Sequence, residues 1–79
     1  PTVNMHIKAP SDQTIYMFFK TEYQKSVNLW LSTEKDADGN YINHKFVGAY
    51  FENHDYHIVN LGKFEPGQEF ELRMTVIQL

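Results

Sequence analysis

Apolar and polar residues alternate along most of this chain, and that alternation constrains the fold more than any other feature. Successive side chains of a β-strand point to opposite faces, so a period of two is typical of strands that bury one face. The segment 70–76 shows the pattern most clearly, because every second residue in it is apolar. The alternation predicts a chain built of strands. A helix would fit only at 21–26, where the β-branched and aromatic flanking residues argue against it.

Turn-forming residues divide the pattern into about six strands. The predicted strands cover residues 2–8, 15–19, 27–32, 41–51, 56–61 and 70–76. Residues 15–19 are apolar on both faces, which predicts a central strand that is covered on each side. A chain of 79 residues has room for one domain. We therefore expect a single domain, residues 1–79, folded as a small antiparallel β-sandwich of jelly-roll or immunoglobulin-like type.

Charge and cysteine content exclude several classes of function. Seven Lys and Arg residues stand against ten Asp and Glu residues, giving a net charge of −3, whereas nucleic-acid binding needs clustered cations. The chain has no cysteine, which excludes disulfides, thiol nucleophiles and cysteine-ligated metals. Its longest apolar run, 15–19, is far shorter than the roughly 18 to 20 residues of a membrane helix. Because the chain begins at Pro1 and ends in an apolar strand, we expect a fragment of a longer protein.

Two groups of residues have the chemistry of metal ligands without the required spacing. His54, Asp55 and His57 suit Zn²⁺, but residues three apart on a strand point to opposite faces, so a polar turn leading into a strand is the better interpretation. The segment 36–40, Asp-Ala-Asp-Gly-Asn, has the alternating oxygens of a calcium loop but lacks the later glutamate, and Asp-Gly favours a hairpin turn. We expect neither a metal nor another cofactor.

Ionisable residues do not form a recognisable catalytic set. The candidate carboxylates for acid–base catalysis lie in predicted turns or on the polar face of the last strand, where we expect side chains to be exposed to solvent. They are Glu52, Asp55, Glu65, Glu69 and Glu71. His6 and His44 are isolated in the sequence and are expected to be exposed or hydrogen-bonded. The chain is therefore predicted to be non-catalytic.

Aromatic rings are the remaining candidates for a binding surface. Such rings stack on sugars, but in a small domain they more often form the core or contact a neighbouring domain. The candidates for a ligand or domain contact are Trp30, Tyr16, Phe18, Tyr50 and Tyr56. Trp30 is the best of them for a surface role, because it lies on the opposite face of its predicted strand from Leu29 and Leu31.

Several segments together resemble a known family. They are the apolar strand at 15–21, Lys-Ser-Val-Asn-Leu-Trp-Leu at 25–31, Gly-Ala-Tyr-Phe at 48–51 and the run from Asn60 to Gly67. The last of these, Asn-Leu-Gly-x-Phe-x-x-Gly, is the most telling. The chain from Ile15 to its end resembles the extracytoplasmic β-domain near the C-terminus of YfhO-type bacterial membrane proteins. It departs from the family in its longer hairpin, Glu34 to Asn43, where a short Asn-Gly turn is typical.

The resemblance implies a large polytopic protein related to membrane glycosyltransferases that use lipid-linked sugars, some of which decorate cell-wall teichoic acids. The catalytic acids of such proteins are expected in the membrane helices and first external loop, so none is carried over to this chain. The implied role is a non-catalytic accessory domain at the extracytoplasmic face of the bacterial membrane. It would pack on the membrane portion or hold a cell-wall glycopolymer acceptor.

Two other hypotheses remain open. The first is a free-standing carbohydrate-binding module, which requires an exposed Trp30 beside other rings. The second is an interaction domain that adds a strand to a partner, which requires only free strand edges and would appear as a symmetric strand-paired dimer.

Overall fold

Strands account for all the regular structure in the described part of the chain. A computed structural model describes residues 1–10, 12–51 and 56–79. Its long strands are β1 (Thr2–Lys8), β2 (Thr14–Lys20), β3 (Lys25–Ser32), β6 (Lys45–Tyr50), β7 (Tyr56–Lys63) and β8 (Glu69–Gln78). Two short strands, β4 (Glu34–Lys35) and β5 (Tyr41–Ile42), form a separate ribbon. None of the described residues belongs to a helix that would span a bilayer, and the predicted all-β class is confirmed.

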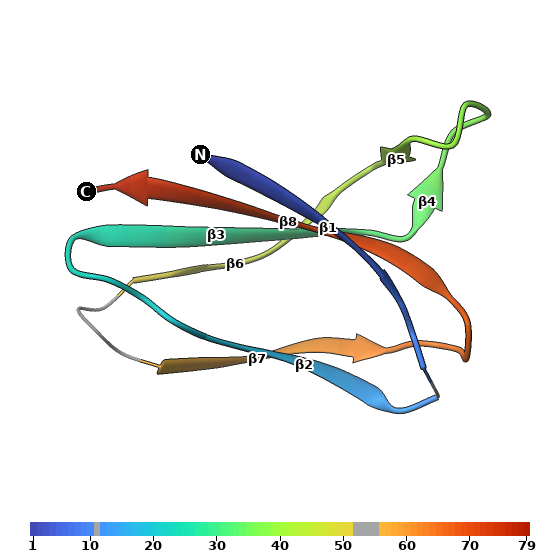
Figure 1. Cartoon of the computed structure of the whole chain (residues 1–79), viewed down its shortest axis with the longest axis horizontal. Coiled ribbons are helices and arrows are strands. Elements are labelled where there is room, and N and C mark those ends of the chain that lie inside the picture. The colour runs from blue at the N-terminus through green and yellow to red at the C-terminus, as the bar shows by residue number, and fades with distance from the viewer. Residues whose placement is uncertain (11, 52–55) are drawn as a thin grey trace.

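The long strands form two layers. One sheet has the order β1-β8-β3-β6, and the other consists of β2 and β7 (Figure 1). All pairings are antiparallel. Each of the connections β1–β2, β2–β3, β6–β7 and β7–β8 passes from one sheet to the other. In an immunoglobulin sandwich the A–B, D–E and F–G connections stay within one sheet. Of the connections between the long strands here, only the one from β3 to β6 stays within one sheet, so the strand order is that of a jelly roll.

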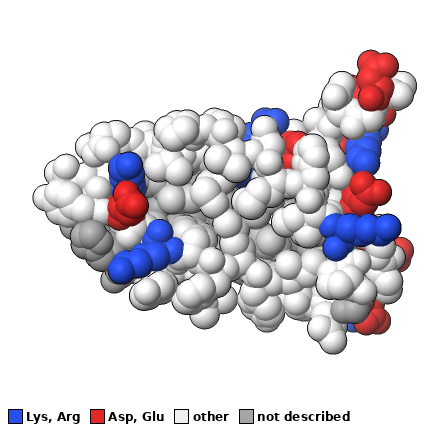
Figure 2. All heavy atoms as spheres, in the orientation of Figure 1, with Lys and Arg blue, Asp and Glu red and all other residues white. Residues whose placement is uncertain are grey.

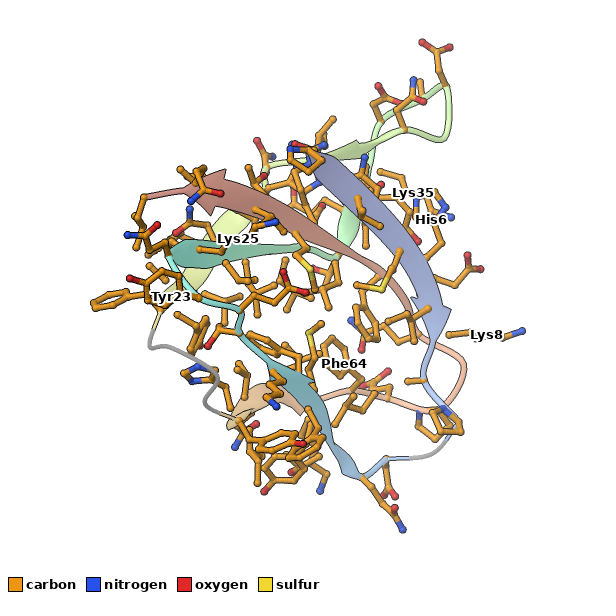
Figure 3. The ribbon with its side chains drawn as sticks, turned by 60° about the vertical axis from the view of Figure 1, so that its left-hand side comes forward. His6, Lys8, Tyr23, Lys25, Lys35 and Phe64 are labelled. Atoms are coloured by element: carbon orange, nitrogen blue, oxygen red, sulfur yellow. The ribbon has the colours of Figure 1, made fainter. Side chains whose placement is uncertain are left out.

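The space between the layers is filled by alternate side chains of both sheets. Leu29, Phe70 and Leu72 are fully buried on the four-stranded side, and Val59 and Leu61 of β7 meet them. Phe64 lies between the layers (Figure 3), and its ring stacks on that of Phe70 with centroids 4.3 Å apart. The period-two prediction is confirmed for β8, whose residues Phe70 and Leu72 point inward.

The interpretation of residues 15–19 as a strand covered on both faces is wrong. Ile15, Met17 and Phe19 pack on the core, but Tyr16 and Phe18 are exposed on the outer face of β2. The β2–β7 sheet has only two strands, and no described residue forms a third layer over it. Apolar residues on both faces of a strand therefore do not by themselves predict that the same chain covers both faces.

The predicted strand 41–51 is divided into β5 and β6. Asn43 between them has a φ of 56°, in the left-handed region that Asn tolerates better than most residues, and its Nδ2 donates to Glu34 Oε2 at 2.8 Å. The predicted hairpin turn at 36–40 is confirmed. Oδ1 of Asp36 accepts the backbone N–H groups of residues 38 and 40, each at 2.9 Å.

The run from Asn60 to Gly67, which carries the family resemblance, has a structural role here. Asn60 Oδ1 accepts the N–H of Gly62 at 2.8 Å, where a bulge shifts the register between β7 and Ile15–Tyr16 of β2. Gly67 has a φ of 79° and donates its N–H to the carbonyl of Ala9 at 2.8 Å. These residues shape the path from β7 into β8, and their polar groups are used within the chain.

Replacing Gly62 tests the bulge. Gly62 has a φ of 105°, which an L side chain rarely adopts even though a Cβ atom there would meet nothing within 4 Å. We expect Gly62→Ala to lower the free energy of unfolding by about 1 to 3 kcal/mol in urea titration. Lys63→Ala, at the exposed end of the same strand, should change it by less than about 0.5 kcal/mol. Equal stability of the two variants would contradict this role for the glycine.

Candidate functional site

The predicted contact residues lie on different faces of the sandwich. Trp30 lies on the outer face of the four-stranded sheet, whereas Tyr16 and Tyr56 lie on the outer face of the β2–β7 sheet. Tyr50 packs against the core, and its ring contacts those of Phe19 and His57, each with centroids 5.5 Å apart. The four residues therefore do not form one site, and each outer face has to be considered separately.

The outer face of the β2–β7 sheet is apolar and exposed. Tyr16, Phe18, Tyr56 and Ile58, here called the aromatic face, are 61%, 63%, 64% and 69% exposed. Phe18 and Tyr56 stack with centroids 5.3 Å apart and an interplanar angle of 11°. The ammonium of Lys20 lies 5.2 Å from the Tyr56 ring centre, a cation–π distance. Contiguous exposed apolar side chains of this kind mark contact surfaces.

Strand register makes the aromatic face continuous. Phe18 pairs with Ile58, and Lys20 pairs with Tyr56, so the side chains of both strands are neighbours on the same face of the sheet. In the described part of the chain, neither edge of this two-stranded sheet is paired with another strand. The ribbon β4–β5 would extend the sheet in a complete jelly roll, but here it pairs only with itself.

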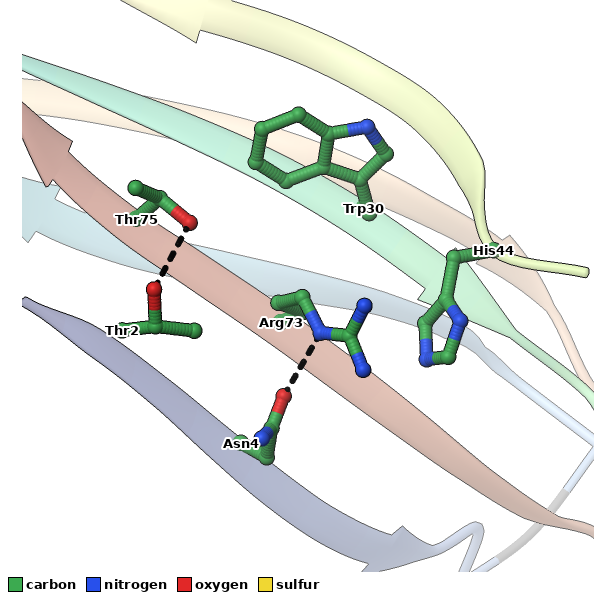
Figure 4. Close-up of a pocket in the computed structure, with 6 residues that line it drawn as sticks. All are labelled: Thr2, Asn4, Trp30, His44, Arg73 and Thr75. Atoms are coloured by element: carbon green, nitrogen blue, oxygen red, sulfur yellow. Dashed lines mark hydrogen bonds between the residues drawn. The ribbon is translucent and has the colours of Figure 1, made fainter. Parts of the chain in front are cut away.

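A shallow groove lies on the outer face of the four-stranded sheet. Its volume is about 490 Å³. The residues that line it, here called the Trp30 groove, are Thr2, Asn4, Trp30, His44, Arg73 and Thr75 (Figure 4). Register explains their convergence, because Arg73 on β8 pairs with Asn4 on one side and with Trp30 on the other. Trp30 points outward, as predicted, but it is half-buried rather than fully exposed.

The groove combines a ring surface with polar side chains. Figure 4 shows the indole of Trp30 face-on, lying along β3 with Arg73 on the neighbouring strand. Phe46, itself exposed, places its ring 5.5 Å from that of Trp30. Arg73 Nε donates to Asn4 Oδ1 at 2.9 Å, and the hydroxyls of Thr2 and Thr75 are 3.3 Å apart. A flat apolar surface beside hydrogen-bonding groups is suited to binding a ligand.

A buried carboxylate lies at the end of this groove. Glu71 is only 7% exposed, and its Oε2 accepts a hydrogen bond from His6 Nε2 at 2.7 Å. Its Oε1 accepts a second bond from His44 Nε2 and lies 3.5 Å from Nη2 of Arg73. Because an ionised carboxylate only accepts, both imidazoles carry their proton on Nε2. We call Glu71, His6 and His44 the Glu71 cluster.

The sequence-based interpretation of Glu71 as a solvated surface residue is wrong. His6 and His44 were expected to be exposed or hydrogen-bonded, and both hydrogen-bond to Glu71. The ribbon explains the burial, because Tyr41 of β5 lies against His6 with ring centroids 5.1 Å apart. Lys35 of β4 places its ammonium 5.0 Å from the Tyr41 ring centre, and His6 and Lys35 lie on the same side of the molecule (Figure 3). The extended hairpin thus covers the Glu71 end of the sheet.

Two opposing effects act on the Glu71 carboxyl. Burial disfavours its charge and by itself raises the pKa. The hydrogen bonds from His44 and His6, together with their charges, lower it by more, so the pKa of Glu71 lies below its ordinary value. The carboxylate is therefore ionised at neutral pH and is held by its two imidazole donors.

The residues that the sequence singled out as possible metal ligands make other contacts where the structure describes them. His54 and Asp55 lie outside the described residues, while His57 Nε2 lies 3.2 Å from the hydroxyl of Thr21 and its ring packs on Phe19. Asp36 uses its carboxylate within the hairpin turn. Among residues 1–10, 12–51 and 56–79, no group of three or more His, Asp or Glu side chains is arranged to hold a metal ion.

The chain is thus a small jelly-roll domain with an exposed aromatic face on one sheet and a shallow groove on the other. Comparison with protein-family models, curated proteins and solved structures gave no match to the chain.

Proposed function

We propose that this chain is a non-catalytic accessory domain at the extracytoplasmic face of a bacterial membrane, belonging to a polytopic protein of the glycosyltransferase type. Its aromatic face would pack on the membrane portion of that protein. The observation that carries the docking role is the exposure of Tyr16, Phe18, Tyr56 and Ile58 on one sheet face. The class of the parent protein is supported by the resemblance of residues 15–79 to YfhO-type domains.

The distribution of charge agrees with a docking role. In the view of Figure 2, most Lys, Arg, Asp and Glu side chains lie toward the two ends of the molecule, and a few lie near the middle of its upper edge. At the aromatic face, the ammonium of Lys20 lies over the ring of Tyr56, 5.2 Å from its centre. Removing such a face from water would stabilise a docked state by about 25 cal/mol for each Å² of apolar area buried.

The complete gene tests the class of the parent protein. We expect about a dozen hydrophobic segments, each of roughly 20 residues, to be encoded together with this domain. A gene that encodes no such segments would contradict the assignment to a polytopic membrane protein, without bearing on the fold.

Site-specific crosslinking tests the docking face. A photoreactive phenylalanine analogue at Ile58 is expected to crosslink to the rest of the parent protein in membranes. The same analogue at Phe46, which is 59% exposed on the other sheet, is the matched control and should crosslink at least about fivefold less, because it lies on the opposite outer face. Equal crosslinking from both positions would show that the aromatic face has no special role.

The second candidate function is a free-standing carbohydrate-binding module. The observation that favours it is the Trp30 groove, where an indole and an exposed phenyl ring lie beside hydrogen-bonding side chains. A gene without membrane segments, together with glycan binding that depends on Trp30, would select this function over the first.

The strand-adding hypothesis retains its structural requirement, since both edges of the β2–β7 sheet are unpaired among the described residues. Its signature is a dimer in light scattering that an edge-strand proline substitution, such as Phe18→Pro, dissociates. A monomer at all concentrations would reject it.

A further inference from the structure

We propose that the Trp30 groove binds an acidic saccharide, with the sugar ring stacked on Trp30 and its carboxylate or phosphate group bound by Arg73. The inference deepens the second candidate function and rests on glycan binding by this face. It does not depend on docking through the aromatic face, which lies on the other sheet.

The ring surface indicates a sugar. The C–H face of a pyranose is flat and weakly apolar, and it stacks on an indole while its hydroxyls remain free to hydrogen-bond. Trp30 lies along the sheet with its ring face toward the groove (Figure 4), and Phe46 extends the apolar surface at an angle of 62°. Among the described residues, none accepts a hydrogen bond from the indole N–H. That donor is available to a ligand hydroxyl.

The charge of the groove indicates an acidic substituent. Arg73 is the one permanently charged residue that lines it among those described. A guanidinium has five N–H donors: Nε is used by Asn4, and Nη2 lies a long 3.5 Å from Glu71. The Glu71 carboxylate accepts hydrogen bonds from His6 and His44, and its distance of 3.5 Å from Nη2 leaves the guanidinium N–H groups free to donate elsewhere. The remaining guanidinium donors form a fork that matches a carboxylate or phosphate.

The spacing of the strands places the ring of Trp30 next to the guanidinium of Arg73. Trp30 and Arg73 are directly paired across β3 and β8, and side chains in that relation start about 5 Å apart. That spacing is close to the width of one pyranose ring, so a ring on Trp30 places its substituents over Arg73. Asn4, Thr2 and Thr75 supply further polar groups along the same face. The groove volume of about 490 Å³ is in the range of small-ligand sites.

The test uses two acidic probes and their uncharged counterparts. Trigalacturonic acid is compared with its methyl ester, and glucose 6-phosphate with glucose. Trp30 is the single tryptophan of the chain, so its fluorescence reports on the groove without labelling. We expect a saturable change with at least one acidic probe and at least about tenfold weaker binding of its uncharged counterpart, the effect of losing a hydrogen bond to a charged group. Comparison of the two acids distinguishes carboxylate from phosphate.

Variants assign the binding to its residues. In calorimetric titration, Trp30→Ala should abolish the binding heat, and Arg73→Gln should weaken binding by about tenfold or more. Tyr56→Ala, which removes an exposed ring from the other sheet, is the matched control and should bind like the parent chain. Amide shifts of the unmutated protein provide an independent readout, because they should concentrate on β1, β3 and β8 whether or not a variant folds.

Four results would overturn the inference. Binding of acidic and uncharged probes with equal affinity would reject the acidic substituent while leaving glycan binding intact. Absence of binding by all four probes would reject both the inference and the second candidate function, without affecting the docking proposal. Amide shifts concentrated on β2 and β7 would show that the probes bind elsewhere and that the groove has another role. A molecular mass in solution that differs between the parent chain and Trp30→Ala would show that the groove serves self-association.

Discussion

Phe70→Ala is expected to lower the free energy of unfolding by about 3 to 5 kcal/mol, the largest loss expected of any substitution described in this protein. The side chain is 0% exposed, and its ring stacks on Phe64 with centroids 4.3 Å apart. Truncating a buried Phe typically costs about 3 to 5 kcal/mol, because the lost contacts add to the cost of the cavity. The total stability expected of a domain of this length is only about 4 to 12 kcal/mol.

The control for this prediction is an apolar residue outside the core. Ile58→Ala removes a branched aliphatic side chain that is 69% exposed, so it should change the free energy of unfolding by less than about 1 kcal/mol. Urea unfolding followed by Trp30 fluorescence measures both variants. If Phe70→Ala were as stable as Ile58→Ala, the core between the two sheets would not be where the structure places it.

Glu71→Gln is expected to have the next largest effect on stability. A Gln side chain has one acceptor oxygen, whereas the Glu71 carboxylate accepts from both His6 and His44. The amide group of Gln would face one of these N–H donors with a donor of its own. Leaving a buried polar pair mismatched costs about 1 to 3 kcal/mol. Glu69→Gln, on the same strand but exposed, is the control and should cost less than about 1 kcal/mol.

The same cluster predicts how stability changes with pH. Because the pKa of Glu71 in the folded state lies below its ordinary value of 4.5, the folded state binds its proton less readily than the unfolded state does. The stability contributed by this ionised carboxylate is therefore complete above about pH 4.5 and is lost as the pH falls through the folded-state pKa.

Glu71→Gln should reduce that acid dependence, which thermal unfolding between pH 7 and pH 3 will measure. The Glu69→Gln control should retain the slope of the parent chain over this range. Parallel curves for the parent chain and Glu71→Gln would show that the two histidines do not hold the charge of Glu71.

The prediction of the fold succeeded where it rested on local chemistry. Alternation located β1, β3 and β8, and Asp-Gly located the ribbon turn, because both depend on neighbours in sequence. It failed for the outer face of β2, since burial depends on whether another layer exists. It also joined β5 to β6, where Asn43 in a left-handed conformation separates them.

The binding surfaces were only partly predictable. The outward position of Trp30 follows from alternation with Leu29 and Leu31, but its pairing with Arg73 does not. That pairing depends on β3 lying beside β8, a neighbour that is distant in sequence. The division of the aromatic candidates between opposite faces has the same origin. Only register across strands brings particular side chains together.

What the sequence by itself determined is the strand content and the side of each strand on which apolar residues lie, because a side chain's direction on a strand follows from its position along the chain. What only the tertiary structure decided is the identity of the neighbours across strands. Glu71 is a polar residue on a polar face in the sequence, yet His6 and His44 come from distant segments to surround it. Its burial and lowered pKa arise from contacts that only the jelly-roll strand order and the ribbon over its end create.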